Sequence, residues 1–332
     1  MKKVLLINPT IQPCGVNILS SGAEIVMAPD GKEDTLISYL SAGNISAVVA
    51  RVERITRRII ENAPGLEVIG QHGVGVDNID VKAATDQGVL LVNAPASNFM
   101  SVAEHAVMMM LGLARRVIES DSAVRKDDFQ FRERFYPGEI NGKKLFALGL
   151  GRIGTEVAKK CRLAFNMKVL AYDPYVSELE MLSMGVKKVD LDEGLKEADV
   201  VSIHLPLTDK TRQIIAEREI ALLKPHTFLI NVSRGGVVKQ DDLVRALKEG
   251  RIRGAGLDVF DPEPPKPGDP ILELPNVILS PHFAGDTYEA KQRVSTSLAN
   301  DILTVLKGNL PRFLVNPEVF KSKKILAKWA QS

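Results

Sequence analysis

Short apolar runs alternate with amphipathic segments along most of the chain. In the first third, the apolar runs predict strands at Val4–Ile7, Glu24–Met27, Ala47–Ala50, Glu67–Ile69 and Val89–Val92. Between several of these strands, the apolar residues are spaced as on one face of a helix. These amphipathic segments are Thr35–Leu40, Ile55–Glu61 and Ile79–Asp86. Because strands and helices alternate, the pattern favours parallel sheets whose strands are joined by crossover helices.

A second alternating series fills the middle of the chain. Its predicted strands are Lys144–Leu148, Val169–Tyr172, Val200–Ile203, Thr227–Asn231, Gly254–Asp258 and Val277–Leu279. The stretch "DPEPPKPGDP" (261–270) carries five prolines, and the strand pattern resumes after it, so we expect a rigid loop there. With 332 residues, the chain is long enough for two α/β domains with separate cores.

Two long helices are also predicted. The stretch "AVMMMLGLA" is apolar on nearly every side, and Ser101 with Glu104 fits a capping box, so a helix that starts at Ser101 should be buried between domains or subunits. Residues 286–307 predict the second helix. The tail "KSKKILAKWA" predicts a short amphipathic helix that docks through Trp329, and a membrane-surface element is the alternative.

Composition narrows the class of protein. Apolar residues make up 45% and charged residues 25%, as in ordinary globular proteins, and a net charge of +2 does not favour nucleic acid or anionic membranes. The apolar stretch 106–114 is too short to span a membrane, and the N-terminus has too few apolar residues for a signal peptide. The only cysteines are Cys14 and Cys161, which suits a reducing cytosol.

The stretch "GLGRIG" at 149–154 matches the G-x-G-x-x-G pattern of dinucleotide-binding turns. A predicted strand precedes it and a predicted helix follows it, as the binding mechanism requires. Gly149 allows the tight turn, Gly151 lets the backbone approach a pyrophosphate, and Gly154 lets the helix pack on the strand. The N–H groups at the start of the helix would face the phosphates. A purely structural glycine turn is the alternative.

The next predicted strand ends in Asp173, nineteen residues after Gly154. A carboxylate at this position accepts hydrogen bonds from ribose hydroxyls and repels a 2′-phosphate. The following residues, Pro174, Tyr175 and Val176, offer no cation for such a phosphate. We therefore predict NAD as the cofactor in preference to NADP.

Three later strands end in groups that suit hydride-transfer chemistry. Arg234 follows one strand, Glu263 lies on the proline-rich loop after the next, and His282 follows the last. If these strands are parallel, the groups converge at one edge of the sheet. A guanidinium clamps a 2-keto acid and polarises its carbonyl, an imidazole supplies a proton, and a carboxylate orients the imidazole and raises its pKa.

Each of these groups has an ordinary alternative: a structural ion pair, a solvated loop charge or a polar strand end. Among the other histidines, His204 is the main rival proton donor, although a cofactor contact fits it better. His105 is expected in the core, His226 at the opposite edge of the sheet, and His72 beside a glycine turn whose amides meet the substrate. No spacing of histidines, cysteines and acids resembles a metal site.

Taken together, these motifs resemble those of the D-isomer-specific 2-hydroxyacid dehydrogenases, which include D-3-phosphoglycerate, hydroxypyruvate/glyoxylate and D-lactate dehydrogenases. The similar stretches run in the family's order from Leu66 to Ala284: "QHGVGVDNIDVKAATDQGV", "VAEHAVMMMLGLAR", "GLGRIG", "HLPLT", "INVSRGGVV", "GAGLDVFDPEP" and "SPHFAG". The chain before Leu66 and the tail match mainly in pattern.

The resemblance implies roles for individual residues. Arg234 would bind and polarise the substrate, Glu263 would support the histidine, and His282 would transfer the proton. The backbone amides implied for the substrate carboxylate are those of Val74, Gly75 and Val76. The implied NAD contacts, besides the three glycines of the turn, are Arg152, Ile153, Asp173, His204, Pro206, Thr211, Val232, Ser233 and Asp258.

The resemblance also implies the domain organisation. Residues 1–98 and 286–332 would form a discontinuous, flavodoxin-like substrate-binding domain, and the inserted residues 99–285 an NAD-binding Rossmann domain. A homodimer would form through the cofactor domains, with the helix from Ser101 and the arm around Phe129–Pro137. The presence of Glu263 argues against a formate dehydrogenase, and a relative with a regulatory C-terminal domain is expected to be longer.

The substrate is expected to be small and anionic, of the 3-phosphoglycerate, hydroxypyruvate or glyoxylate type. Specificity should lie in the loops after the first domain's strands, "PTIQPCGVN" and "RVER". Arg51 and Arg54 in the second loop are candidates for holding a distal anion, and ordinary surface charge is an equally good interpretation. The alternative class is an NAD(H)-sensing, corepressor-like binding protein, which the absence of a long polar tail disfavours.

Overall fold

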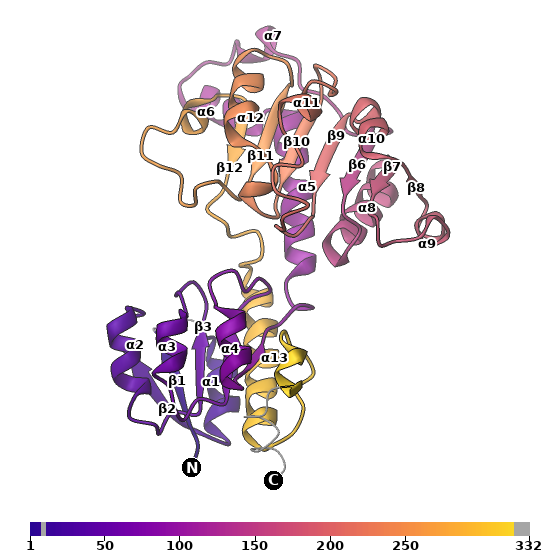
Figure 1. The fold of residues 1–332 in the computed structure, drawn as a ribbon. Coiled ribbons are helices and arrows are strands. Elements are labelled where there is room, and N and C mark those ends of the chain that lie inside the picture. Colours follow the sequence, from indigo (N-terminus) through magenta and orange to yellow (C-terminus); the bar gives the residue numbers. More distant parts are fainter. Residues whose placement is uncertain (8–10, 322–332) are drawn as a thin grey trace. The chain divides into compact units, whose positions relative to one another are not determined.

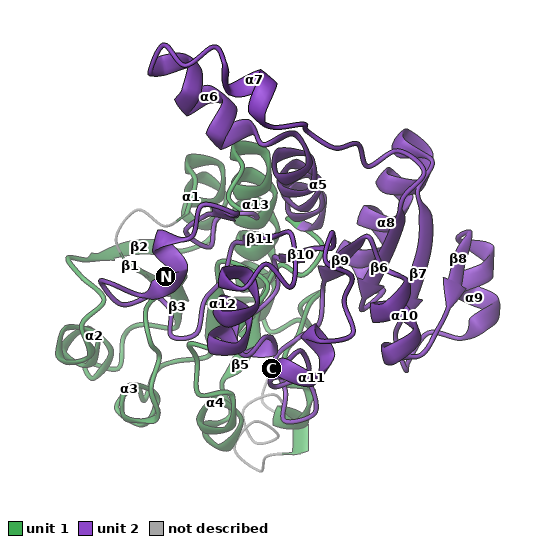
Figure 2. Cartoon of the chain, turned by 90° about the horizontal axis from the view of Figure 1, so that it is seen from above, with its two compact units in different colours: residues 1–98, 286–332 green, residues 99–285 purple. Residues whose placement is uncertain are grey.

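The computed structural model describes residues 1–7 and 11–321. The chain forms two compact units: unit 1 comprises residues 1–98 and 286–332, and unit 2 comprises residues 99–285 (Figures 1 and 2). Each unit is built on a parallel sheet covered by helices, which confirms the predicted fold class. The predicted docking through Trp329, and residues 9 and 10 of the first predicted specificity loop, lie outside the described residues.

The sheet of unit 1 has the strand order β2-β1-β3-β4-β5, and neighbouring strands are parallel. Its strands are β1 (Lys3–Ile7), β2 (Glu24–Ala28), β3 (Ala47–Ala50), β4 (Val68–Gln71) and β5 (Leu90–Val92). The chain adds β2 on one side of β1 and then crosses to β3 on the other side. Such a switch point is where open α/β sheets bind ligands, at the carboxyl ends of the strands.

Helices cover both faces of this sheet. They are α1 (Pro13–Ser20), α2 (Glu33–Leu40), α3 (Arg57–Glu61), α4 (Val81–Gln87) and α13 (Tyr288–Leu306), with a 3-10 turn at Pro317–Lys321. On one face, Leu298 and Ile302 of α13 share an apolar cluster with Leu6 of β1. Gly70 of β4 permits this packing, because a Cβ there would lie 2.7 Å from Cδ1 of Ile302.

The sheet of unit 2 has the strand order β12-β11-β10-β9-β6-β7-β8, again with parallel neighbours. Its strands are β6 (Lys144–Leu148), β7 (Lys168–Tyr172), β8 (Val186–Lys188), β9 (Val200–Ile203), β10 (Phe228–Asn231), β11 (Gly254–Leu257) and β12 (Val277–Leu279). The apolar pattern does not predict β8, because only Val186 is buried and two lysines follow it. Lysines are usual on edge strands, where they prevent pairing with other chains.

The helices of unit 2 are α5 (Phe99–Arg115), α6 (Val117–Arg125), α7 (Phe131–Arg134), α8 (Arg152–Phe165), α9 (Glu178–Ser183), α10 (Leu191–Glu197), α11 (Glu217–Ile220) and α12 (Gln240–Lys248), with 3-10 turns at Gly235–Val237 and Pro270–Glu273. The apolar helix α5 packs on α8, β10 and β11. Its predicted start is wrong: Ser101 lies buried inside the first turn, because neither Phe99 nor Met100 breaks a helix. Among the described residues, no helix is long and apolar enough to cross a membrane.

Candidate active site

Three adjacent strand ends in unit 2 carry the predicted catalytic groups. The strands β10, β11 and β12 are neighbours and run parallel, so their carboxyl ends meet at one edge of the sheet. Arg234 follows β10, Glu263 lies on the loop after β11, and His282 follows β12. The fold thus brings to one edge three groups that are far apart in the sequence.

His282 is paired with Glu263. Nδ1 of the imidazole lies 2.5 Å from Oε1 of the carboxylate. The two side chains are 47% and 38% exposed, so a small molecule can reach the pair. Because Nδ1 is engaged by Glu263, Nε2 is the ring nitrogen available to exchange a proton with a substrate.

Asp258 holds the loop that carries His282. Its buried carboxylate accepts hydrogen bonds from Oγ of Ser280 (2.6 Å) and from the backbone N–H groups of Phe283 and Ala284 (both 3.0 Å). His282 has a φ of 52°, in the left-handed region that residues other than glycine rarely adopt. Since these bonds hold the side chain of Ser280 before His282 and the backbone after it, they stabilise that conformation.

His105 supports the same loop from α5. Its Nε2 lies 2.9 Å from Oγ of Ser280, and its ring meets the ring of Phe283 edge-on, with the centroids 5.4 Å apart. Burial lowers the pKa of His105, although the nearby charge of Asp258 opposes this, so the neutral ring is favoured at neutral pH. The predicted hydrogen-bond partner is present, but His105 is only partly buried and does not lie in the core as predicted. Its contact with the loop of His282 is not apparent from the sequence.

Asn231 arranges the turn that presents Arg234. Its buried side chain accepts hydrogen bonds from N (3.1 Å) and Oγ (2.9 Å) of Ser233 and donates one to the carbonyl of Arg234 (2.9 Å). The guanidinium of Arg234 donates to the carbonyl of Ser233 (2.8 Å). Asn231 has no role in the predicted site, although a polar residue that ends the buried strand "FLIN" is a usable signal.

The electrostatics of the pair suit proton transfer. The hydrogen bond with Glu263 raises the pKa of His282 above its ordinary value, while burial and the charge of Arg234 oppose this. Burial acts to raise the pKa of Glu263, but the hydrogen bond and the charge of His282 lower it overall. The pair therefore keeps the proton on the imidazole. The charge of Arg234 acts on both groups, so the guanidinium lies within electrostatic reach of both.

The glycine turn at 149–154 lies at the switch point of this sheet, between β6 and β9. Gly149 has a φ of 93°, and a Cβ on Gly154 would lie 2.0 Å from the carbonyl oxygen of Gly149, so both positions require glycine. At Gly151, no described atom lies within 4 Å of a Cβ position, and α8 starts at the next residue without a side-chain cap. Open space beside uncapped helix amides fits a bound pyrophosphate.

Asp173 directly follows β7 beside this turn. One carboxylate oxygen accepts a hydrogen bond from N of Leu150 (2.8 Å) and the other from N of Tyr175 (2.9 Å). Each oxygen retains a second lone pair, so the carboxylate is still able to accept from ribose hydroxyls. In the first turn of α8, Arg152 is exposed and Ile153 is half-buried.

His204 follows β9 and packs on the glycine turn, where its Cδ2 would lie 3.3 Å from a Cβ on Gly154. Neither ring nitrogen has a hydrogen-bond partner within the described part of the chain, and burial lowers the pKa to about 3. A ring that stays neutral is a poor proton donor, so this geometry favours His282 over its rival. In the loop that follows His204, the hydroxyl of Thr211 donates a hydrogen bond to the carbonyl of Pro206 (2.5 Å), which fixes the conformation of this loop.

The remaining histidines have structural partners. His226 precedes β10, at the amino edge of the sheet, and its Nε2 lies 3.0 Å from Oδ1 of Asp199. In unit 1, Nε2 of the buried His72 lies 2.8 Å from Oγ of Ser295, and burial, together with the charge of Arg51, lowers the pKa of His72 to about 4. In the ranges that the structure describes, no three His, Cys, Asp or Glu side chains are grouped closely enough to hold a metal ion.

In unit 1, the loop after β4 presents three consecutive amides. Among the described residues, the N–H groups of Val74, Gly75 and Val76 have no hydrogen-bond acceptor, and Val74 is exposed. The side chain of Asn93 donates to the carbonyl of Val74 (2.6 Å) and braces the loop. Successive unpaired N–H groups bind anions, which fits the role predicted for these amides. Arg51, at the end of β3, forms an ion pair with Asp286.

Known proteins are similar to this chain in both sequence and fold. Residues 107–284 match the family model described as D-isomer specific 2-hydroxyacid dehydrogenase, NAD binding domain. The D-3-phosphoglycerate dehydrogenase of Methanocaldococcus jannaschii is 40% identical over 326 residues, which cover 98% of this chain and 61% of that protein. The glyoxylate reductase of Thermococcus litoralis is 36% identical over 330 residues, which cover 97% of this chain and 99% of that protein.

A solved structure of D-lactate dehydrogenase from Aquifex aeolicus, complexed with NAD and lactic acid, has a TM-score of 0.84 and 30% identity, and the match covers 95% of this chain and 99% of that one. The chain spans about three-fifths of the length of the archaeal phosphoglycerate dehydrogenases that it matches. It spans nearly all of the glyoxylate reductase. The chain therefore belongs to the D-isomer-specific 2-hydroxyacid dehydrogenase family and carries its NAD-binding domain.

Proposed function

We propose that the protein is an NAD-dependent oxidoreductase that interconverts a D-2-hydroxy acid and its 2-keto acid. The observation that carries this proposal is the His282–Glu263 pair, within electrostatic reach of Arg234 and in the same unit as a dinucleotide-type turn. An acid with a tuned pKa beside a guanidinium is what reduction of a keto acid requires from protein. Unit 2 would bind the cofactor, and unit 1 would bind the substrate.

Each member of the trio has a separate role in this proposal. Bound NADH supplies the hydride that reduces the carbonyl carbon. Arg234 holds the substrate carboxylate and polarises the carbonyl oxygen. His282 gives its Nε2 proton to the oxygen as negative charge develops there, and Glu263 orients the ring and stabilises its protonated form. In the direction of oxidation, the neutral imidazole takes the hydroxyl proton.

The cofactor would lie along the carboxyl edge of the sheet in unit 2. Gly149, Gly151 and Gly154 leave room for the pyrophosphate, and Asp173 would accept hydrogen bonds from the ribose. The negative charge of Asp173 favours NAD over NADP, because it repels a 2′-phosphate. The further contacts proposed are with Arg152, Ile153, His204, Pro206, Thr211, Val232, Ser233 and Asp258.

The substrate would be small and anionic. The relatives at this level of identity are named for 3-phosphoglycerate and glyoxylate. The unpaired amides of Val74, Gly75 and Val76 support binding of the substrate carboxylate, which such 2-keto acids share. In a substrate that carries a second anionic group, this group would meet Arg51, which is here paired with Asp286. The unpaired cysteines, Cys14 and Cys161, support a cytosolic location.

We also propose a homodimer that forms through unit 2. An apolar surface on α5, α6 and the segment around α7, called here the arm surface, supports it, and Figure 2 shows α6 and α7 standing away from the rest of this unit. The exposed members of the arm surface are Met108, Val117, Ile118, Val124, Phe129, Phe135 and Tyr136. Contiguous apolar surface of this kind marks protein interfaces in soluble proteins.

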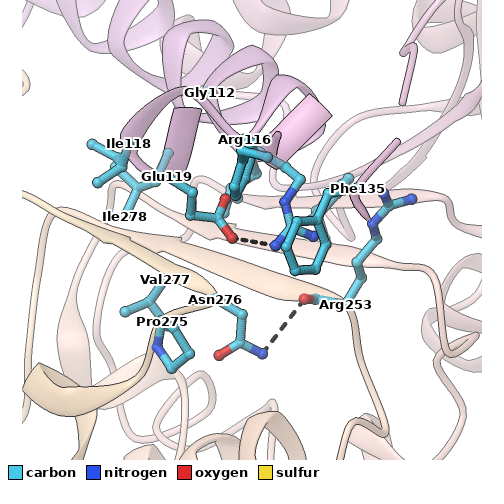
Figure 3. Close-up of a pocket in the computed structure, with 13 residues that line it drawn as sticks. Gly112, Arg116, Ile118, Glu119, Phe135, Arg253, Pro275, Asn276, Val277 and Ile278 are labelled. Atoms are coloured by element: carbon cyan, nitrogen blue, oxygen red, sulfur yellow. Dashed lines mark hydrogen bonds and ion pairs between the residues drawn. The ribbon is translucent and has the colours of Figure 1, made fainter. Parts of the chain in front are cut away.

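A pocket of about 390 Å³ borders the arm surface (Figure 3). Its wall includes Ile118 and Phe135, and the guanidinium of Arg116 lies over the ring of Phe135 at 4.3 Å. Phe228 and Val277, the first residues of β10 and β12, also line it, so the pocket lies at the amino edge of the sheet, opposite the catalytic trio. This position suits a side chain from a second copy better than a substrate.

Turnover of 2-keto acids with NADH, followed by the absorbance of NADH, tests the proposed activity. We expect the wild-type protein to reduce glyoxylate or hydroxypyruvate, and His282→Ala to lose about 10²- to 10⁴-fold in kcat. The matched control is His226→Ala, because this histidine also pairs with a carboxylate but lies at the opposite edge. Tight NADH binding without turnover of any keto acid would favour the corepressor-like alternative.

A further inference from the structure

Arg51 lies at the switch point of the sheet in unit 1. It directly follows β3, which pairs with β1 at the place where the chain crosses from one side of the sheet to the other. Ligands of open α/β sheets bind at the carboxyl edge at such a point. The side chain of Arg51 is 32% exposed, so its charge is accessible to an anion that enters this edge.

Arg51 already has an anionic partner. Its guanidinium forms an ion pair with Asp286, the residue before the N-cap Thr287 of α13. The same carboxylate oxygen of Asp286 lies 3.5 Å from Nζ of Lys291, in the first turn of α13. One carboxylate therefore bridges two cations that come from different parts of unit 1.

Two groups beside this bridge, Glu53 and His72, do not add positive charge to it. The carboxylate of Glu53 accepts hydrogen bonds from the N–H groups of Arg51 (2.8 Å) and Val52 (3.1 Å), so the amides that follow β3 already have an acceptor. His72 follows the neighbouring strand β4, and its lowered pKa of about 4 keeps it neutral at physiological pH. Around the bridge, the charges of Arg51 and Lys291 are thus balanced by two carboxylates.

We propose that Asp286 is a specificity-determining residue that reserves this edge for 2-keto acids with a single anionic group. The proposal rests on the proposed function. A substrate with a second anion, such as a phosphate, has to displace Asp286 from Arg51 and is repelled by its carboxylate. Without the charge of Asp286, Glu53 offsets only one of the two charges of Arg51 and Lys291, and the net positive charge that remains attracts such a substrate.

Asp286→Asn tests this role with two substrates that differ only by a phosphate, hydroxypyruvate and phosphohydroxypyruvate. We expect the ratio of kcat/KM for the phosphorylated over the unphosphorylated substrate to rise roughly twofold to fivefold, the effect of one partly exposed charge. The gain should come from a lower KM for phosphohydroxypyruvate. The matched control is Asp86→Asn, because Asp86 also bridges an arginine and a lysine of unit 1, Arg57 (3.4 Å) and Lys82 (2.8 Å), and we expect no change of the ratio there.

The double variant Asp286→Asn/Arg51→Gln should lose the gain, since the freed guanidinium is then absent. Asp286→Ser serves as the second variant if the asparagine variant unfolds at a lower temperature than the wild-type protein. If the ratio is unchanged in both Asp286→Asn and Asp286→Ser, or if the gain persists in the double variant, the proposed role of Asp286 is overturned. The proposed function is not affected by that outcome. No turnover of any 2-keto acid by the wild-type protein would instead overturn the proposed function and this role together.

Discussion

Two carboxylates that follow β11 contribute to the presentation of His282 in different ways. Asp258 is buried and binds the hydroxyl of Ser280 and the backbone N–H groups of Phe283 and Ala284, whereas Glu263 is partly exposed and binds the imidazole itself. A carboxylate that contacts a titrating ring changes the proton affinity of that ring. A carboxylate that binds backbone amides changes where the ring lies. At the scale of single residues, Glu263 is therefore expected to dominate the pH dependence, and the charge of Asp258 adds a smaller contribution that also raises the pKa of His282.

We expect Glu263→Gln to lower the pKa of His282, because a neutral amide does not stabilise the imidazolium. Reduction of a keto acid needs the protonated ring, so its rate falls as the pH rises through this pKa. In the variant, the fall should occur at lower pH, while oxidation, which needs the neutral ring, should extend to lower pH. Profiles of kcat/KM against pH in both directions measure this, and profiles that do not move would contradict the role of Glu263.

At the scale of elements, two glycines where the turn meets α8, Gly151 and Gly154, have different surroundings. A Cβ on Gly154 would collide with the carbonyl oxygen of Gly149, while a Cβ on Gly151 would meet no described atom within 4 Å. Gly154 is thus required by the packing of helix on strand. Gly151 is not required by any described contact within the chain, which is expected where the space belongs to a ligand.

We expect Gly151→Ala to keep the thermal stability of the wild-type protein but to weaken NADH binding, because the added methyl group occupies the space of the pyrophosphate. Gly154→Ala should instead destabilise the fold by about 1–3 kcal/mol, the usual effect of overpacking. Thermal unfolding and titration of NADH fluorescence separate the two effects. If Gly151→Ala bound NADH as tightly as the wild-type protein does, the assigned pyrophosphate site would be wrong.

Elements that rest on continuous apolar runs were predictable from the sequence. The strands Ala47–Ala50, Lys144–Leu148, Val200–Ile203 and Val277–Leu279 have their predicted bounds. The strand β8 was not predictable, because an edge strand with two lysines has no apolar pattern. The trio was predictable because parallel strands bring their ends together. The pairing of Arg51 with Asp286 was not, since the two residues are 235 positions apart and no local pattern relates them.

At the scale of the whole molecule, the arm surface predicts that two copies of the chain form a dimer. Ile118 is 61% exposed and lines the pocket of Figure 3, so a charge at this position should not affect folding but should prevent a second copy from packing there. We expect the wild-type protein to be a dimer in light scattering and Ile118→Glu to be a monomer with an unchanged unfolding temperature. Leu179→Glu is the matched control, because Leu179 is similarly exposed but lies on α9. A wild-type monomer would contradict the proposed dimer.

The division of unit 1 between two chain segments has a consequence for biosynthesis. Its five strands leave the ribosome early, but α13, which supplies Leu298 and Ile302 to one face of the sheet, follows only after all of unit 2. Until α13 emerges, the apolar face around Leu6 and Val49 is covered only in part, by α1, and is prone to aggregation. Unit 2 is one uninterrupted segment, so all of its helices and strands are synthesised one after another. Unit 2 is therefore expected to complete its fold before unit 1, and the early strands are expected to need protection until α13 has been synthesised.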